Sequence, residues 1–481
     1  MSDTFLHGVQ VLEVDDGIRP IRTVRSSVIG LVGFGDNDET RASIQIGTGN
    51  AKLKFTAVPD LGAAGNNVTV RAINPGTNNA SLSVSVSGNA ITISLATDGS
   101  AAATSTASQV LAAVNATSAV TDFLLEASLG TGSSGASVYV AHAATNLVGG
   151  VDSTFPLDTP VLVTSPTGLD ARLGADSYLG LALEAIYKQA GAVVVVVRTE
   201  DPSGDATELT GVYALKRAQA DLGYTPRIIV AEGGHIDGGG SVIGDLKSVA
   251  ASCRAIAIVG LPSSVYTSAT DATGWVSDNG NERTFAIWPS INGGQDPAPF
   301  VAGVLAKSDN DNGFWWSPSN QEAFGISQLD SPVDFQLGDS TSLANVLNEG
   351  KVTTFIRQGG FRVWGNLTGS IDPKWQFLSV RRTADIINDS ILYNHLWAVD
   401  RNITRTYLED VSDGVNAYLA TLTNLGAIIG GKCWPDPVLN SPDQIALGKV
   451  YFNFEFTPPY PAQTVTFRSI LTNDYLSELI D

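Results

Sequence analysis

The sequence predicts a multidomain chain with a Rossmann-like α/β middle domain, an α+β C-terminal domain, an inserted β-rich domain and extended arms at both ends. Its 481 residues are enough for about three compact domains. Between residues 151 and 350, amphipathic helical segments alternate with short apolar runs, as in a layered α/β domain. Residues 46–150 instead contain short segments in which apolar residues alternate with Ser or Thr, which indicates antiparallel strands.

Composition and charge exclude several classes of function. Only 16% of the residues are charged and 43% are hydrophobic, which argues against intrinsic disorder. A formal net charge of −20 repels nucleic-acid phosphates, so we expect no nucleic-acid partner. The longest aliphatic run, Ala192–Val197, is too short to span a bilayer, and no direct membrane insertion is expected. Two cysteines are too few for a disulfide framework or a thiolate metal site, which favours folding in a reducing cytoplasm.

The first 45 residues predict an exposed arm that leads into a buried strand. We expect residues 1–20 to form an N-terminal arm, in which Val9 and Val11 share one face at the strand period of two and Val14 adds a further contact. Residues 21–45 then join the arm to the core, and Ser27–Phe34 is predicted as a buried strand because it is almost continuously apolar.

Residues 46–150 predict an inserted β-rich outer domain. Its clearest element is a hairpin in which Leu82–Val86 and Ile91–Leu95 alternate apolar and polar residues around a turn at Gly88-Asn89. Other predicted elements are strands at 52–58, 67–73 and 138–141 and a helix at 108–116.

Residues 151–350 predict a sheet inside layers of helices. A helix capped by Asp176 or Ser177 ends at Gly191, and the strand Val193–Val197 follows directly. Because this strand is apolar on both faces, it is expected inside a parallel sheet. The same rhythm predicts helices near 207–219 and 241–252 and strands at 227–231, 255–259 and 284–288.

Residues 351–460 predict an α+β C-terminal domain, and residues 461–481 a C-terminal arm. The domain is expected to contain a hairpin (353–357 and 361–364), helices at 383–397 and 403–424, and a strand at 451–456. After the turn Pro458–Pro461, residues 463–471 are predicted as another strand. This arm contains the apolar residues Val465, Phe467, Ile470 and Leu471.

The sequence contains no convincing catalytic, cofactor or metal site. The Gly33–Asp38 loop lacks the third glycine of a dinucleotide-binding turn, and no phosphate-binding GxxxxGK[ST] loop is present. Among the four histidines, only His235 follows a predicted parallel strand, but no nucleophile motif accompanies it. Asp309–Gly313 resembles the start of a calcium loop without its later ligand, so a solvated polar loop is expected. We therefore predict no enzyme activity, no cofactor and no metal.

Basic residues are concentrated in the segment 357–405. Seven Lys or Arg residues stand against four Asp residues there, a local net charge of +3 in a chain of −20. Two interpretations remain open: these groups pair with acids elsewhere in the fold, or they form a face that meets an acidic partner.

Sequence stretches at both ends of the chain carry a resemblance to a known family. The first are FLHGVQVLE (5–13) and SSVIGLVG (26–33); the others are GGFRVWG (359–365), VRRTADII (380–387) and FEFTPPYPAQ (454–463). They are similar to the N-terminus and the C-terminal domain of the contractile tail sheath proteins of bacteriophages and of R-type pyocin-like particles, the tailocins. By this resemblance, residues 46–150 are one of the variable outer insertions of the family.

The resemblance implies a structural protein that assembles as stacked hexameric rings around a tail tube, in the tail of a virion or a tailocin particle. Each subunit would lend its two arms to sheets of neighbouring subunits. The contact residues would be Val9, Val11 and Val14 of the first arm and Val465, Phe467, Ile470 and Leu471 of the second. Besides other copies of itself, the implied partners are the tail tube, baseplate and tail terminator proteins, with assembly in the bacterial host cytoplasm and contraction that drives the tube through the cell envelope. Arg381 and Arg382 are the residues that we expect to face the tube. Two alternatives stay open: an α/β enzyme, or a surface-binding module built on the 46–150 domain.

Overall fold

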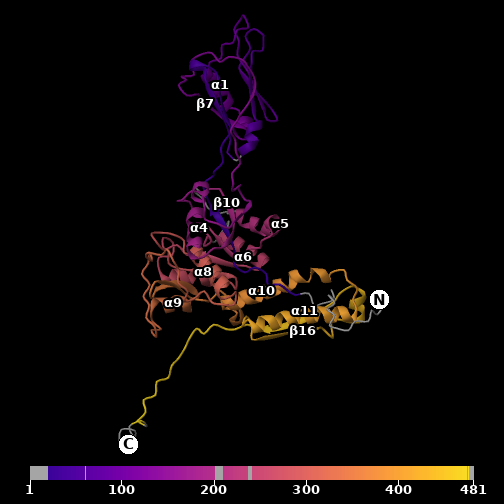
Figure 1. The fold of residues 1–481 in the computed structure, drawn as a ribbon. Helices are drawn as coiled ribbons and strands as arrows, with labels where there is room; N and C mark the ends of the chain where they lie inside the picture. Colours follow the sequence, from indigo (N-terminus) through magenta and orange to yellow (C-terminus); the bar gives the residue numbers. More distant parts are fainter. Residues whose placement is uncertain (1–19, 60, 201–209, 237–240, 474, 476–481) are drawn as a thin grey trace, which may run out of the picture.

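The computed structural model describes residues 20–473 and 475, except residues 60, 201–209 and 237–240. Three parts follow one another along its long axis (Figure 1): the inserted domain at one end, an α/β domain in the middle, and an elongated C-terminal part across the other end, from which the C-terminal arm leaves. The predicted N-terminal contacts Val9, Val11 and Val14 lie outside the described residues.

An eight-stranded sheet forms the centre of the α/β domain. Its strand order is β15-β14-β13-β12-β11-β1-β10-β9. The six inner strands are parallel, and the two edge strands are antiparallel to their neighbours. The strands are β1 (Val28–Phe34), β9 (Pro160–Val163), β10 (Val193–Thr199), β11 (Ile228–Ala231), β12 (Ile256–Gly260), β13 (Thr284–Ile287), β14 (Val352–Arg357) and β15 (Phe361–Trp364).

Helices cover both faces of this sheet because its strands are apolar on both sides. Ile29 and Leu31 belong to the core beneath α4 (Tyr178–Gln189) and α8 (Ala298–Asp311). Val28 and Val32, which point the other way, belong to the core beneath a second group of helices. That group contains the 3₁₀ segment Thr210–Arg217, α6 (Val242–Cys253) and α7 (Ala269–Asn279); the remaining helices of the domain are α3 (Asp170–Leu173), α5 (Ala218–Leu222) and α9 (Leu343–Glu349).

The predicted mixed α/β class is confirmed, and most of the predicted strands and helices of this domain are present. The finer Rossmann-like assignment is not confirmed. Four helices, α3, α7, α8 and α9, were not predicted; α8 is buried along almost its whole length and so has no clear polar face for a periodicity argument. The hairpin β14–β15, which the sequence analysis assigned to the C-terminal domain, completes the central sheet instead.

The inserted domain has its own core between two small sheets and a helix. The sheets have the orders β2-β3-β7 and β5-β6-β4-β8. The predicted hairpin and helix are confirmed, but the strand expected at 138–141 is wrong: Val138 forms only an isolated bridge with Thr106, and strand β8 begins at His142. The elements are β2 (Ser43–Ile46), β3 (Leu53–Ala57), β4 (Thr69–Ile73), β5 (Ser83–Ser87), β6 (Ala90–Ser94), α1 (Ala107–Asn115), α2 (Ser118–Thr121), β7 (Leu125–Leu129) and β8 (His142–Asn146).

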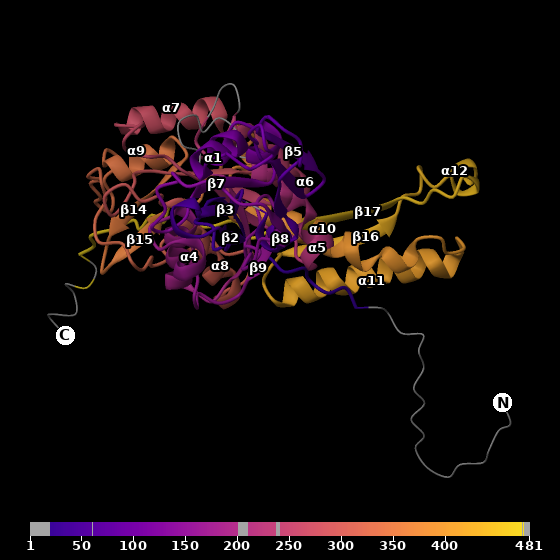
Figure 2. The ribbon, with the colours of Figure 1, turned by 90° about the horizontal axis from the view of Figure 1, so that it is seen from above.

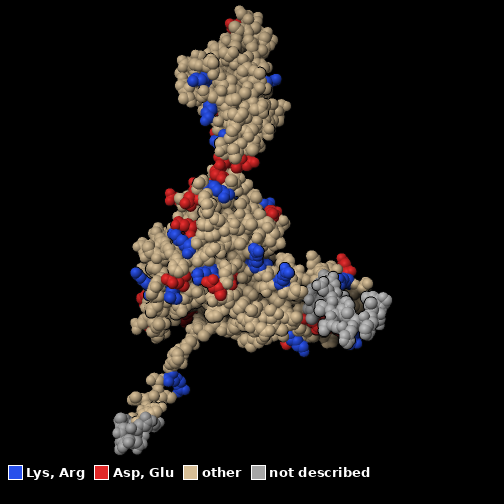
Figure 3. Space-filling view, in the orientation of Figure 1, with Lys and Arg blue, Asp and Glu red and all other residues tan. Residues whose placement is uncertain are grey.

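Two adjacent chain segments connect the inserted domain to the α/β domain, and we call them the neck (residues 36–42 and 147–155). Thr40 and Val151 form an antiparallel bridge there. Asp38 accepts hydrogen bonds from the Thr154 N–H at 2.8 Å and the Ser153 hydroxyl at 2.9 Å. Acidic side chains gather at the neck, whereas the inserted domain shows few charges in this view (Figure 3).

Two helices and a two-stranded sheet form the C-terminal unit (residues 378–457). Ile386 and Ile387 of α10 (Leu378–Asn394) pack against Val415 and Leu419 of α11 (Arg405–Asn424). The sheet consists of β16 (Gly430–Pro435) and β17 (Phe452–Thr457), and α12 (Pro442–Ala446) lies between these strands in sequence. In Figure 2, α12 lies at the far end of the C-terminal unit. None of the helices in the described part of the chain could span a membrane.

Candidate assembly interface

The C-terminal arm lies away from the folded body and exposes its apolar side chains. In the described residues after Thr457 the chain enters no sheet, so the strand expected at 463–471 has no partner within the subunit. Phe467 is 91% exposed and Leu471 97% exposed, and Val465 and Ile470 are exposed as well. Burying a side chain of this kind stabilises a complex by about 1.5–3 kcal/mol. The arm therefore has the properties of a segment that folds against another molecule.

The β16–β17 sheet offers a matching surface. Its register runs from the Gly430–Thr457 pair to the Pro435–Phe452 pair, and it includes no third strand among the described residues. Phe452, Phe454 and Phe456 pack against the core that contains α11. An isolated two-stranded ribbon is only marginally stable in water, and its unpaired edges can accept an added strand.

The start of the described chain reaches the same unit. The Arg22 N–H donates to Asn394 Oδ1 at 3.1 Å, and Asn394 Nδ2 donates to the Arg22 carbonyl at 2.8 Å. The Val24 N–H donates to Ser390 Oγ at 3.0 Å. Residues 22–24 are thus held along α10 before the chain enters β1.

Exposed apolar side chains are numerous on the C-terminal unit. They lie in the last turn of α10, between α10 and α11, after α11, and around α12. Such a density of exposed apolar residues is typical of a protein–protein interface. The residues are Leu392, Tyr393, Leu396, Val399, Leu425, Ile429, Val438, Leu439 and Leu447.

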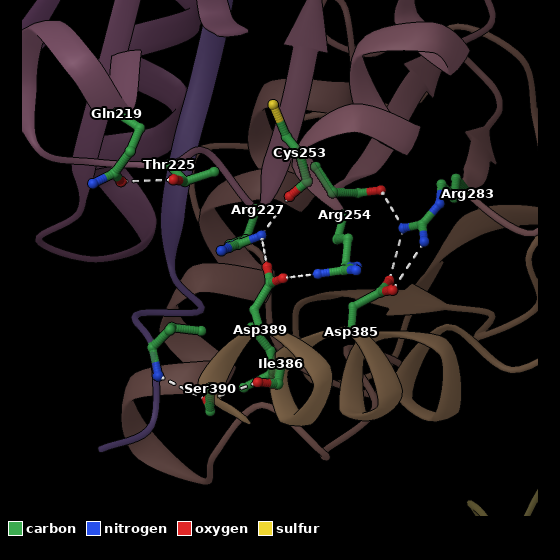
Figure 4. Close-up of polar contacts among 12 residues, drawn as sticks. Gln219, Thr225, Arg227, Cys253, Arg254, Arg283, Asp385, Ile386, Asp389 and Ser390 are labelled. Atoms are coloured by element: carbon green, nitrogen blue, oxygen red, sulfur yellow. Dashed lines mark hydrogen bonds and ion pairs between the residues drawn. The ribbon is translucent and has the colours of Figure 1, made fainter. Parts of the chain in front are cut away.

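Buried ion pairs attach α10 to the α/β domain (Figure 4). Arg283 donates to both oxygens of Asp385 at 2.7 and 2.9 Å, and Arg381 donates to the same carboxylate at 2.6 and 3.1 Å. One turn later, Asp389 pairs with Arg227 and Arg254, and Arg227 also donates to the Cys253 carbonyl. Removing one partner of such a buried pair costs about 3–5 kcal/mol, because the other charge stays buried without compensation.

A third pair corrects two predictions. Arg382 donates to both oxygens of Asp309 at 2.6 and 2.5 Å, and the two side chains are only 3% and 1% exposed. Arg381 is mostly buried as well, with its guanidinium 4.1 Å from the centre of the Trp375 ring. The expectation that Arg382 faces a tube is therefore wrong in this conformation, and Arg381 presents little free charge. Asp309 is also not part of a solvated loop, since it lies in the last turn of α8.

Sequence reasoning missed these partners because Arg227, Arg254, Arg283 and Asp309 are 73 to 162 residues away from the α10 residues that they bind. The sequence did contain one signal of these buried pairs. Arg382, Asp385 and Asp389 have the i, i+3, i+7 spacing of a single helix face, which they share with the apolar Ile386. Charged residues on an apolar helix face indicate buried pairs.

The edge of the sheet where an α/β enzyme would bind its ligand is largely filled by the chain itself. Tyr178 lies against Gly33, where an added Cβ would be 2.4 Å from the Tyr178 ring. The Tyr178 hydroxyl donates to Asp296 at 2.8 Å, and the same carboxylate accepts the Ala298 N–H at 2.8 Å. Burial raises the pKa of Asp296 despite these hydrogen bonds, and burial together with the Asp296 charge raises the pKa of Tyr178. Gly33 thus serves close packing.

His235 lines the remaining cavity of about 330 Å³ at this edge. Its ring lies edge-on to Tyr266 at a centroid distance of 5.9 Å, and its carbonyl accepts a hydrogen bond from Trp275 Nε1 at 2.9 Å. These contacts describe a packed histidine and supply no catalytic evidence. In the described part of the chain, no group of three or more His, Cys, Asp or Glu residues is arranged to hold a metal ion.

Comparison with known proteins identifies the family. Models described as the phage tail sheath C-terminal domain, the phage tail sheath protein central domain and the tail sheath protein Gp18 domain III N-terminal region match residues 370–472, 215–368 and 134–199. A putative prophage major tail sheath protein of Pseudomonas aeruginosa is 38% identical over 354 residues, which cover 69% of this chain and 90% of that protein. The chain belongs to the phage tail sheath protein family, whose members are structural proteins rather than enzymes.

Two further comparisons concern the whole chain. The tail sheath protein of Burkholderia phage BcepMu is 26% identical and covers 100% of this chain and 99% of its own length. The helical sheath of the anti-feeding prophage in its contracted state has the same fold, with a TM-score of 0.52, 14% identity, and coverage of 98% of this chain and 100% of that one. The Pseudomonas relative thus matches over most of its length while leaving about a third of this chain unmatched, and the three family models begin only at residue 134.

Proposed function

We propose that this chain is the subunit of a contractile tail sheath whose copies assemble as stacked hexameric rings around a tail tube. Contraction of the sheath drives the tube through the host cell envelope. The partners are other copies of the chain, the tail tube protein, and the baseplate and tail terminator proteins. The sheath forms in the bacterial host cytoplasm and is part of a phage tail or a tailocin particle.

One observation carries this proposal: an exposed apolar arm and a two-stranded sheet with available edges occur in the same subunit. A strand that is donated to a neighbour links copies head to tail, and a head-to-tail contact that does not close grows into a helical assembly. The N-terminal arm starts beside the same C-terminal unit, which supports a joint built from strands of several copies.

The ion pairs of α10 support a mechanism in which the subunit moves as a rigid body. They join the C-terminal unit to the α/β domain at three buried carboxylates, so these two parts rotate together. The arms stay paired with neighbouring copies while the bodies rotate outward. The work then comes from new contacts in a lower-energy lattice, which is reached from a kinetically trapped extended state.

Electron microscopy of the purified protein tests the proposal, and ridged hollow tubes of uniform width are the expected result. A variant that lacks residues 1–20 should stay a folded, soluble monomer, because those residues complete a sheet in another copy. Circular dichroism checks folding, and sedimentation checks the oligomeric state. Long tubes formed by the truncated variant would contradict the role of the arm.

A further inference from the structure

An uncharged groove lies beside the root of the C-terminal arm. It encloses about 710 Å³, and none of its lining residues is Lys, Arg, Asp or Glu. Trp316, Trp364 and Phe377 supply aromatic surface, and Trp316 is half exposed. Residues 459–464 at the root of the arm form one wall, where Tyr460 lies edge-on to Phe377 at 6.2 Å between ring centroids.

An amide in the groove lacks one of its hydrogen bonds. Asn366 is 8% exposed, and its Nδ2 donates to Ser379 Oγ at 3.3 Å, while its Oδ1 has no partner. A buried carbonyl oxygen without a donor is unfavourable by about 1–3 kcal/mol. Around this buried amide the groove presents uncharged aromatic surface, which fits an uncharged apolar polypeptide segment.

A segment of matching chemistry lies at the tip of the C-terminal unit (residues 436–451). Val438 is 81% exposed, and Leu439 and Leu447 are exposed beside it. Asp436 fixes this turn, since its Oδ1 accepts the N–H groups of Val438 and Leu439 at 2.8 and 2.7 Å. Asp443 is the one charged residue between positions 437 and 447. The tip is thus a preorganised apolar surface, which reduces the entropy lost on binding.

The tip and the arm root that lines the groove lie at opposite ends of the C-terminal unit. Figure 2 shows α12 at one end of the C-terminal unit and the C-terminal arm leaving at the other. Because of this distance, the two surfaces cannot contact each other within one subunit. A contact between them in different copies is head to tail, and its repetition gives a ring or a helix instead of a closed dimer.

We propose that the tip of one copy docks in the uncharged groove of the next copy. This inference rests on the proposed assembly, and it names a contact by which neighbouring copies in that assembly bind each other. The arm that leaves from the groove then starts directly beside the β16–β17 sheet of the docked neighbour, which places an unpaired strand next to an available edge. Val438 and Leu439 pack on the aromatic residues of the groove.

Disulfide crosslinking tests the contact. The double variant Leu439→Cys with Trp316→Cys places one thiol on each surface, whereas the native Cys253 and Cys433 are buried and stay unreactive. In assembled protein, mild oxidation should give a ladder of covalent oligomers on a non-reducing gel. Crosslinks should form at least about tenfold faster than in the control pair Leu439→Cys with Phe123→Cys, because docking raises the effective concentration of the thiols.

Mixing distinguishes a head-to-tail contact from other associations. Equal amounts of the Leu439→Cys and Trp316→Cys single variants should give covalent dimers and nothing larger. Tubes seen by electron microscopy without crosslinking above the control would overturn this contact while leaving the proposed function intact. A ladder without tubes would support the contact and contradict the sheath assembly, and a protein that stays monomeric and does not crosslink would overturn both.

Discussion

Arg382 of α10 and Asp309 of α8 form a bidentate ion pair that is almost completely buried, although 73 residues separate them. Arg382 also donates to the Ser26 carbonyl at 3.1 Å, just before β1. One guanidinium therefore joins the C-terminal unit, the last turn of a helix of the α/β domain, and the segment that leads from the N-terminal arm into the central sheet.

Asp309→Asn should lower the free energy of unfolding by about 3–5 kcal/mol, because Arg382 would remain charged and buried without its partner. Chemical denaturation measures this difference. The matched control is Arg405→Met, which breaks the surface pair with Glu409 in which the arginine side chain is 92% exposed. That change should cost less than about 1 kcal/mol. Similar small effects for both variants would show that the buried pair does not join the two parts.

Phe467→Asp combined with Ile470→Asp should abolish tube formation and leave the isolated subunit as stable as before. Both side chains are exposed in the subunit, so their loss removes no internal contact, while a charge at these positions opposes burial in a neighbour. Thermal denaturation and electron microscopy measure the two effects. As a control, Val265→Asp changes an exposed residue of the α/β domain and should still form tubes. Normal tubes from the arm variant would refute the arm contact.

Excision of the inserted domain should leave assembly intact. The Ser43 N–H donates to the Val148 carbonyl at 2.9 Å, so the two ends of the excised segment are adjacent. Replacing residues 43–148 by two glycines therefore joins Ala42 to Gly149 without strain on the α/β domain. We expect a folded protein that forms tubes, since the inserted domain has its own separate core. A folded variant that stays monomeric would show that the insertion takes part in the lattice.

The neck should loosen in acid. Burial alone would raise the pKa of Asp38, but hydrogen bonds from Thr154 and Ser153 and the charge of Arg172 lower it below its ordinary value of 3.8. A carboxyl group with a lowered pKa in the folded state stabilises that state above the ordinary pKa, and the contribution disappears as the pH falls through the lowered value. Hydrogen exchange of the Thr154 amide should therefore show weaker protection at pH values below 3.8 than above.

Asp38→Asn should remove this pH dependence, whereas Asp122→Asn on the exposed surface of the inserted domain should keep it. At each pH, the exchange rate of the variant is divided by that of the native protein. This ratio cancels the intrinsic effect of pH on exchange. An unchanged profile for the Asp38 variant would assign the acid sensitivity to another group.

Local patterns predicted the elements whose signals are contained in a few neighbouring residues. The run Val193–Val197 became β10, Ser177 caps α4 through the Gly180 N–H, and the Gly88-Asn89 turn joins β5 to β6. Helix α8 escaped prediction because it is buried on nearly all sides, and β15 was assigned to the wrong domain because its partner in the sheet depends on contacts distant in sequence.

The roles of individual charges could not be predicted in the same way. A sum over residues 357–405 shows an excess of positive charge, but that sum does not tell whether a guanidinium points outward or into the core. Arg381 and Arg382 both pair with internal carboxylates, which left the apolar arm and the aromatic groove, rather than the arginines, as the surfaces available to a partner.

By itself, the sequence determined the class of the chain: alternating patterns specified strands, helical periods specified layers, and the motifs at both ends indicated the sheath family. Tertiary structure alone decided which charges are buried, which sheet edges lack a partner, and which apolar side chains stay exposed. The physical reason is that burial and pairing depend on residues that are far apart in sequence and meet only in the folded chain, whereas secondary structure follows from close neighbours.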